Sequence, residues 1–200
     1  MSATPTIAVP ATYDVDAASR EIHRVVIELV ESVDEAQFHW RPDGYATSIA
    51  FHAWHLARES DFLRAAILER TDGQLGPEFG SKTEIWVSES LLERWGFPPE
   101  IGTAVGTGLT DDVASTLPIP ERSEVLGYLR RSYAELETFV RLVDERYPTA
   151  GGLDPEFGLR VGRIRINVLN FLTHDCRHLG MMEVLKGLQT GFGSATESRP

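Results

Sequence analysis

Apolar residues recur at intervals of three and four along four long segments of the chain, which is the spacing of amphipathic α-helices. The four segments cover about residues 15–33, 48–70, 121–146 and 160–189. Either Thr47 or Ser48 can cap the second helix, since both side chains can accept a backbone hydrogen bond. No segment alternates between apolar and polar residues, so the pattern predicts an all-α protein without β-strands.

The link between the second and third helices, residues 72–119, is long and irregular. It is rich in proline and glycine, and we expect short helices within it, one in "SESLLERWG" capped by Ser88 and one in "LTDDVAST". A link of this length can cross the full length of a bundle, so the third helix can start at the same end as the second. The sequence therefore predicts an up-down-down-up four-helix bundle, with residues 1–200 forming a single domain. Residues 1–13 are expected to be a loose lead-in and residues 190–200 a flexible tail.

Composition narrows the range of partners and locations. The chain has 200 residues and a formal net charge of −11, which argues against nucleic acid as a partner because such binding depends on basic side chains. No apolar run approaches the roughly 20 residues of a membrane span, and the N-terminus lacks the pattern of a signal peptide. The single cysteine, Cys176, fits a reducing compartment, so we expect a cytoplasmic protein that acts on a small molecule.

Two histidines stand one helical turn apart in the apolar fourth segment. His174 and His178 would have Cβ atoms about 6 Å apart, close enough for both rings to reach one metal ion. Such a pair also arises by chance, and two helix histidines at a partly wet interface are the alternative interpretation.

The second helix adds two more histidines within an aromatic-rich stretch, His52 and His55. Several imidazoles that converge from two helices are difficult to satisfy with protein acceptors alone, whereas a divalent cation takes their lone pairs. The pattern predicts a metal site between the second and fourth helices, without deciding between His52 and His55.

Other side chains are candidates for roles around this site. Asn167 and Asn170 share the histidine face of the fourth helix, either as the wall of a polar cleft or as an edge that faces solvent. Glu59 follows His55 by one turn and is the candidate to orient a ligand or to handle a proton. Trp54, Trp40 and Phe51 can line the apolar part of a pocket, although aromatic residues at helical spacing are more often core.

The two residues between His174 and Arg177 point away from the histidine face on a helical wheel. Cys176 is therefore not expected to be a ligand. Asp175 is expected to be a surface charge.

The stretches "WRPDGYATSIAFHAWHLARESDFL" at 40–63 and "LNFLTHDCRHLGMMEVLKGLQTGFG" at 169–193 resemble the DinB-like metal-binding bundle superfamily. This superfamily includes the YfiT-like proteins and the N-terminal domain of mycothiol-dependent maleylpyruvate isomerase. The shared signs are a Trp-Arg-Pro loop, a His-Leu-Ala in the second helix and a late His-x-x-x-His followed by Leu-Gly. The long 72–119 insert departs from the shortest members.

The resemblance implies an up-down-down-up bundle and, in many members, a homodimer. It also implies one divalent metal ion, usually zinc or nickel, with the ligands His55, His174 and His178. His52 has no counterpart in that triad and is expected to be a neighbour of the ligands.

Three histidines leave a coordination position open, which is typical of catalytic rather than structural metal sites. The ion can then activate water or bind a low-molecular-weight thiol as its thiolate. The resemblance favours the thiol, so we expect a thiol-dependent S-transferase or isomerase that acts on a small electrophile. The alternatives are a metal-dependent hydrolase and a non-catalytic metal-binding or dimeric helical module.

Overall fold

The computed structural model of the protein describes residues 15–42, 44, 46–71, 75–147 and 155–191, without the side chains of residues 15, 155–163, 165 and 166. Within these residues the protein is all-helical and contains no strand, as predicted. The four long helices are α1 (Val15–Glu31), α3 (Ile49–Arg70), α7 (Arg122–Arg146) and α8 (Pro155–Thr190).

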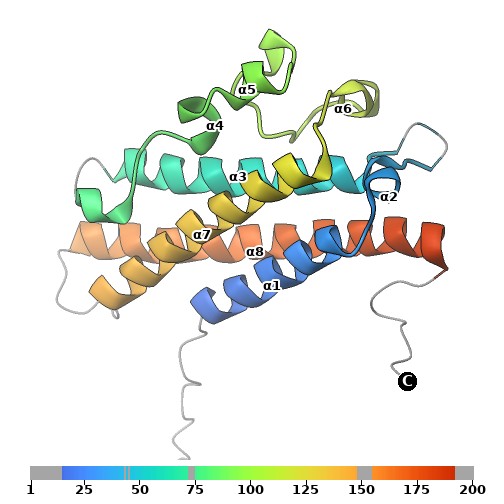
Figure 1. The fold of residues 1–200 in the computed structure, drawn as a ribbon. Coiled ribbons are helices and arrows are strands. Elements are labelled where there is room, and N and C mark those ends of the chain that lie inside the picture. Colours follow the sequence, from blue (N-terminus) through green and yellow to red (C-terminus); the bar gives the residue numbers. More distant parts are fainter. Residues whose placement is uncertain (1–14, 43, 45, 72–74, 148–154, 192–200) are drawn as a thin grey trace, which may run out of the picture.

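The direction of the long helices confirms the predicted topology. Helices α3 and α7 run the same way along the bundle, and α1 and α8 run the opposite way (Figure 1). Helix α3 packs against α7 and α8, and α1 packs against the same two helices. The order is therefore up-down-down-up, with α3 and α8 side by side in opposite directions.

The helix boundaries differ from the prediction in two places. Helix α1 ends at Glu31, two residues before the predicted end, and is followed by a short helix that was not predicted, α2 (Glu35–His39), because Asp34 and Gln37 form a capping box that starts a new helix. Helix α8 begins at Pro155, earlier than the predicted residue 160. Proline suits the first turn of a helix, where its missing N–H has no partner to lose. Ser48 caps α3, since its hydroxyl accepts the N–H of Phe51 at 3.2 Å.

The crossover from α3 to α7 contains several short helices. They are η1 (Pro77–Phe79), α4 (Ile85–Ser88), α5 (Leu91–Arg94), η2 (Pro99–Ile101) and α6 (Asp111–Thr116). The prediction for "LTDDVAST" is confirmed by α6, which Thr110 caps. The prediction that Ser88 caps a helix is wrong, since Ser88 ends α4 and Ser90, at φ 51°, precedes α5. Helix α4 starts earlier because a carboxylate of α3 binds its first N–H groups, an interaction that the local sequence does not reveal.

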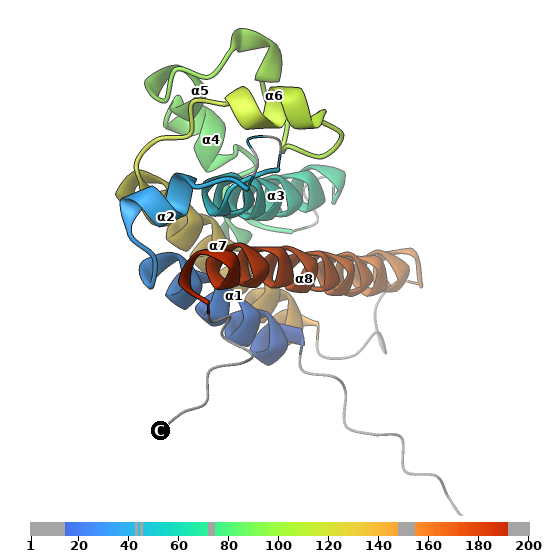
Figure 2. The same ribbon diagram turned by 90° about the vertical axis from the view of Figure 1, so that its right-hand side faces the viewer.

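The crossover covers the face of α3 that is turned away from α1 and α8 (Figure 2). As a result, every residue of α3 from Ile49 to Asp61 is buried. Aromatic side chains of both parts form the contact, with Trp54 of α3 packed against Trp86 and Phe97 of the crossover. Helix α3 is thus a central helix rather than a surface helix with one apolar stripe.

Charged residues of α3 hold the crossover in place. Asp61, fully buried, accepts the N–H groups of Ile85 and Trp86, each at 2.9 Å. The guanidinium of Arg58, also fully buried, donates to Glu84 at 2.7 Å and to the carbonyl of Thr103 at 2.8 Å. Buried charges require such partners, so these contacts fix the crossover above the part of α3 that carries the histidines.

Candidate metal centre

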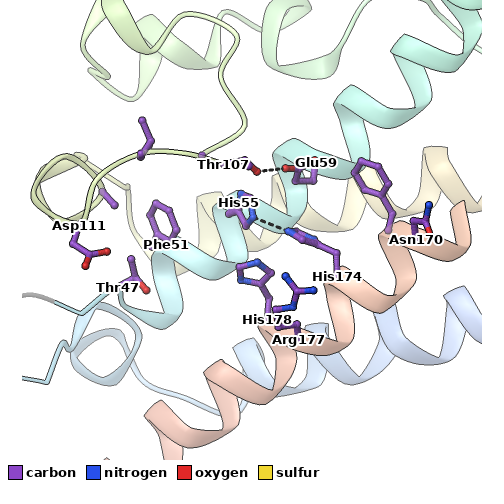
Figure 3. A pocket seen from close by; sticks show the side chains of 14 residues that line it. Thr47, Phe51, His55, Glu59, Thr107, Asp111, Asn170, His174, Arg177 and His178 are labelled. Atoms are coloured by element: carbon purple, nitrogen blue, oxygen red, sulfur yellow. Dashed lines mark hydrogen bonds between the residues drawn. The ribbon is translucent and has the colours of Figure 1, made fainter. Parts of the chain in front are cut away.

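Helices α3 and α8 bring three histidines together. Each of His55, His174 and His178 offers a ring nitrogen, and the three nitrogens lie within 4.8 Å of one another. Nε2 of His55 is 3.0 Å from Nε2 of His174, and His178 completes the triangle (Figure 3). Two nitrogens bound to one zinc ion at 2.0–2.1 Å are about 3 Å or slightly more apart, so the distance between His55 and His174 fits a shared ion.

The outer nitrogens of two of these rings already have partners. Nδ1–H of His55 donates to the carbonyl of Val105 at 2.6 Å, which leaves the lone pair on Nε2. Nδ1 of His178 is 2.9 Å from Nδ1 of His52, and Nε2 of His52 is 3.1 Å from the hydroxyl of Thr47. If Nε2 of His178 binds an ion, its Nδ1–H donates to His52, which in turn donates to Thr47. Such outer partners orient metal ligands.

The electrostatics of the cluster favour neutral imidazoles. Burial, together with neighbouring histidines, lowers the pKa of His178 to about 3 and that of His52 to about 4. Burial also lowers the pKa of His55. The unprotonated nitrogens of His55 and His178 are therefore available as ligands at neutral pH, and a donor set of imidazoles suits zinc or nickel.

The three histidines line an open pocket with a volume of about 410 Å³. Its walls come from α3, α8 and the crossover, which contributes Gly106, Thr107 and Leu109. Glu59 lies on the same wall as His55, is 7% exposed, and accepts a hydrogen bond from Thr107 at 2.6 Å (Figure 3). The pocket thus combines three possible metal ligands with two carboxylates, those of the buried Glu59 and the exposed Asp111.

Comparison with known protein families identifies the family of the chain. A family model described as the DinB superfamily matches residues 20–182, which include all three histidines. The chain belongs to the DinB superfamily. Among curated proteins, none matches the chain.

The other site residues predicted from the sequence of this DinB-superfamily protein do not all lie in the pocket. Asn170 lines the pocket, whereas Asn167 is half-buried outside the pocket lining. His52 lies behind His178 as a neighbour. Of the three aromatic candidates for the apolar wall, Phe51 lines the pocket, whereas Trp54 is fully buried among core aromatics and Trp40 is outside the lining.

Some important residues could not be recognised in the sequence. Asp175 is not a surface charge, because it is 3% exposed and lies between α8 and α1, near His23. Cys176 is exposed and outside the pocket lining, and partial burial and the nearby Asp175 carboxylate raise the pKa of its thiol.

Val105 and Thr107 contact the site from about fifty residues away in the chain, so no local pattern reveals them. The only sequence feature that marks this loop is its glycine-rich segment "GTAVGTGLT".

Gly106 limits the space beside His55. It adopts φ +103°, and a Cβ added there would lie 2.9 Å from Nδ1 of His55 and 3.0 Å from Trp54. We expect Gly106→Ala to displace the ring or the loop and to weaken zinc binding by about tenfold or more, as for other changes behind a metal ligand. Gly108→Ala is the matched control, because Gly108 also has a positive φ, +84°, but has open space around its Cβ position. Equal zinc affinity of the two variants, measured by chelator competition, would contradict the proposed role of the loop.

The lowered histidine pKa values predict how the metal-free protein responds to acid. In the unfolded chain these rings titrate near 6.5, so below that pH the unfolded state binds more protons than the folded state. The stability that the neutral rings of His52 and His178 contribute is therefore fully present above pH 6.5. It is lost as the pH falls toward 4, the pKa of His52, and then toward 3, the pKa of His178. Between pH 7.5 and pH 5 we expect the free energy of unfolding to fall by about 2–4 kcal/mol. Urea titrations of the apo protein test this, and His178→Gln should show a smaller fall than wild type.

Proposed function

We propose that this protein binds one divalent ion, zinc or nickel, through His55, His174 and His178, and acts as a thiol-dependent S-transferase or isomerase on a small electrophile. The observation that carries the proposal is the convergence of three imidazoles in the lining of an open pocket. A structural zinc site usually has four protein ligands, whereas three ligands facing a pocket suit catalysis.

An ion held by these residues would lower the pKa of a coordinated thiol, so that the thiolate is available at neutral pH. The protein's own residues would supply the rest. Glu59, buried at the pocket wall beside His55, is positioned to accept the thiol proton through the oxygen that Thr107 does not use. Phe51, Leu109 and Phe171 give the pocket an apolar side that suits an uncharged electrophile. The pocket's volume, about 410 Å³, sets the size of substrate and thiol together.

Cobalt substitution distinguishes the proposed function from its alternatives. The tag-free protein is loaded with Co²⁺ and titrated with free cysteine, and free serine serves as the control without a thiol. We expect cysteine, but not serine, to produce a thiolate-to-cobalt charge-transfer band. Cobalt binding without that band would contradict the thiol reaction and favour a metal-dependent hydrolase. A protein that binds no cobalt would be a helical module without a metal.

We also propose that the protein forms a homodimer through the exposed side of α8. Met181, Val184 and Leu188 are 43%, 61% and 62% exposed and follow one another at helical spacing. They border an apolar groove of about 490 Å³ beside His52. Light scattering after size exclusion should give the mass of a dimer for wild type and of a monomer for Val184→Glu. A wild-type monomer at micromolar concentration would contradict this interface.

Within the described residues, no helix is both long and apolar enough to cross a membrane.

A further inference from the structure

The carboxylate of Asp175 connects a metal ligand to a histidine on another helix. Asp175 follows His174 directly on α8, and only 4% of its side chain is exposed. Its Oδ1 lies 3.7 Å from Nδ1 of His174, and its Oδ2 lies 3.4 Å from Nε2 of His23 on α1. The two oxygens therefore face two different imidazoles, one at the candidate metal site and one in the bundle interior.

The outer nitrogen of His174 differs from those of the other two ligands. Nδ1 of His55 is bonded to Val105, and Nδ1 of His178 is bonded to His52. Nδ1 of His174 and Oδ1 of Asp175 are both buried, and neither has a hydrogen-bond partner among the described residues. A buried donor and a buried acceptor that are both unpaired are costly, and a small rotation of the ring would pair them.

The far side of Asp175 is held rigidly. Nδ1 of His23 is 2.7 Å from Oε1 of Glu137, and the ring of His23 stacks on Tyr133 with the centroids 3.7 Å apart. His23 is 2% exposed, so these contacts leave it little freedom to move. With one oxygen of Asp175 directed at this fixed ring, the other oxygen remains directed at His174.

We infer that Asp175 is the positioning residue of His174: its Oδ1 accepts the Nδ1–H of that ring when Nε2 binds the ion, and His23 with Glu137 holds the carboxylate in place. A carboxylate behind a ligand histidine fixes the tautomer with the lone pair on Nε2 and makes that nitrogen a better donor to the metal. The inference rests on the metal site of the proposed function and is independent of the thiol reaction.

Zinc affinity of the full chain tests the inference. Competition with a chromophoric chelator should show that Asp175→Asn binds zinc about 10–100-fold more weakly than wild type. Asp112→Asn, the same chemical change at an exposed position of α6, should bind zinc as wild type does. Equal affinity of Asp175→Asn and wild type would overturn the inference and leave the metal site intact. A wild type that binds no zinc would overturn both.

Nuclear magnetic resonance of the zinc-loaded wild type decides the question even if Asp175→Asn does not fold. With histidine ¹⁵N labelling, the Nδ1 proton of His174 should be visible, shifted downfield and slow to exchange, because it is bonded to a buried carboxylate. A His174 Nδ1 proton that exchanges rapidly with water would overturn the inference. Neither measurement involves a thiol, so a failure of the cobalt and cysteine experiment would leave this inference to be judged on its own results.

Discussion

Replacing His174 with alanine should weaken zinc binding by about a hundredfold or more. The binding free energy of zinc at structural sites with four ligands is about 10–16 kcal/mol, or roughly 3 kcal/mol for each ligand. A loss of about 3 kcal/mol raises the dissociation constant by a factor of more than a hundred. Nε2 of His174 is 3.0 Å from Nε2 of His55, so its loss removes a central donor of the triad. Chelator competition on the tag-free protein gives both dissociation constants.

His39→Ala is the matched control for that experiment. His39 lies on the short helix α2, where its half-exposed ring contacts Glu35. The same substitution there should leave zinc affinity unchanged. If His174→Ala and His39→Ala bound zinc equally well, the ion would be held somewhere other than the proposed triad.

Asp61→Asn should cause the largest loss of stability, about 3–5 kcal/mol, because it breaks a fully buried ion-pair network and leaves Arg58 and Arg64 with only their more exposed partners, Glu84 and Glu135. The carboxylate accepts two backbone N–H groups of the crossover and the hydroxyl of Tyr128, and Arg64 lies 3.2 Å away. An asparagine side chain has one acceptor oxygen and no charge, so it cannot replace all of these contacts. Urea unfolding of the metal-free protein measures the change.

Glu100→Gln, which removes one charge from an exposed crossover position, should change stability by no more than about 0.5 kcal/mol. Asp61→Asn should also weaken zinc binding, because it loosens the segment that carries Val105 to His55. Unchanged stability in Asp61→Asn would mean that the crossover is held by its aromatic contacts alone.

The four helices and the approximate site could be predicted because both depend on local spacing. Apolar residues at intervals of three and four define α1, α3, α7 and α8, and a turn of helix places His174 beside His178. The long link between α3 and α7 correctly indicated that these two helices run in the same direction.

The division of roles between His52 and His55 could not be derived from spacing. The two rings are one turn apart on α3, and both contact histidines of α8. His55 is distinguished by Val105, which binds its Nδ1 from the crossover and turns Nε2 toward the pocket. A contact between residues fifty positions apart depends on how the crossover packs on α3, and the spacing of residues along the chain does not predict that packing.

The prediction that Asp175 is a surface charge was wrong for a different reason. The helical wheel correctly placed it away from the histidine face, and the error was to equate that face with the only buried one. Helix α8 packs against α3 on one side and against α1 on another, so it has two buried sides. Asp175 lies on the second side, against His23.

X-ray absorption spectroscopy of the zinc-loaded, tag-free protein tests the central claim most directly, namely that His55, His174 and His178 bind one ion. The account predicts a shell of nitrogen or oxygen atoms at about 2.0–2.1 Å, with the outer-shell scattering of three imidazoles and one further light atom. A sulfur shell at about 2.3 Å, fewer than three imidazoles, or a protein that retains no zinc would contradict it.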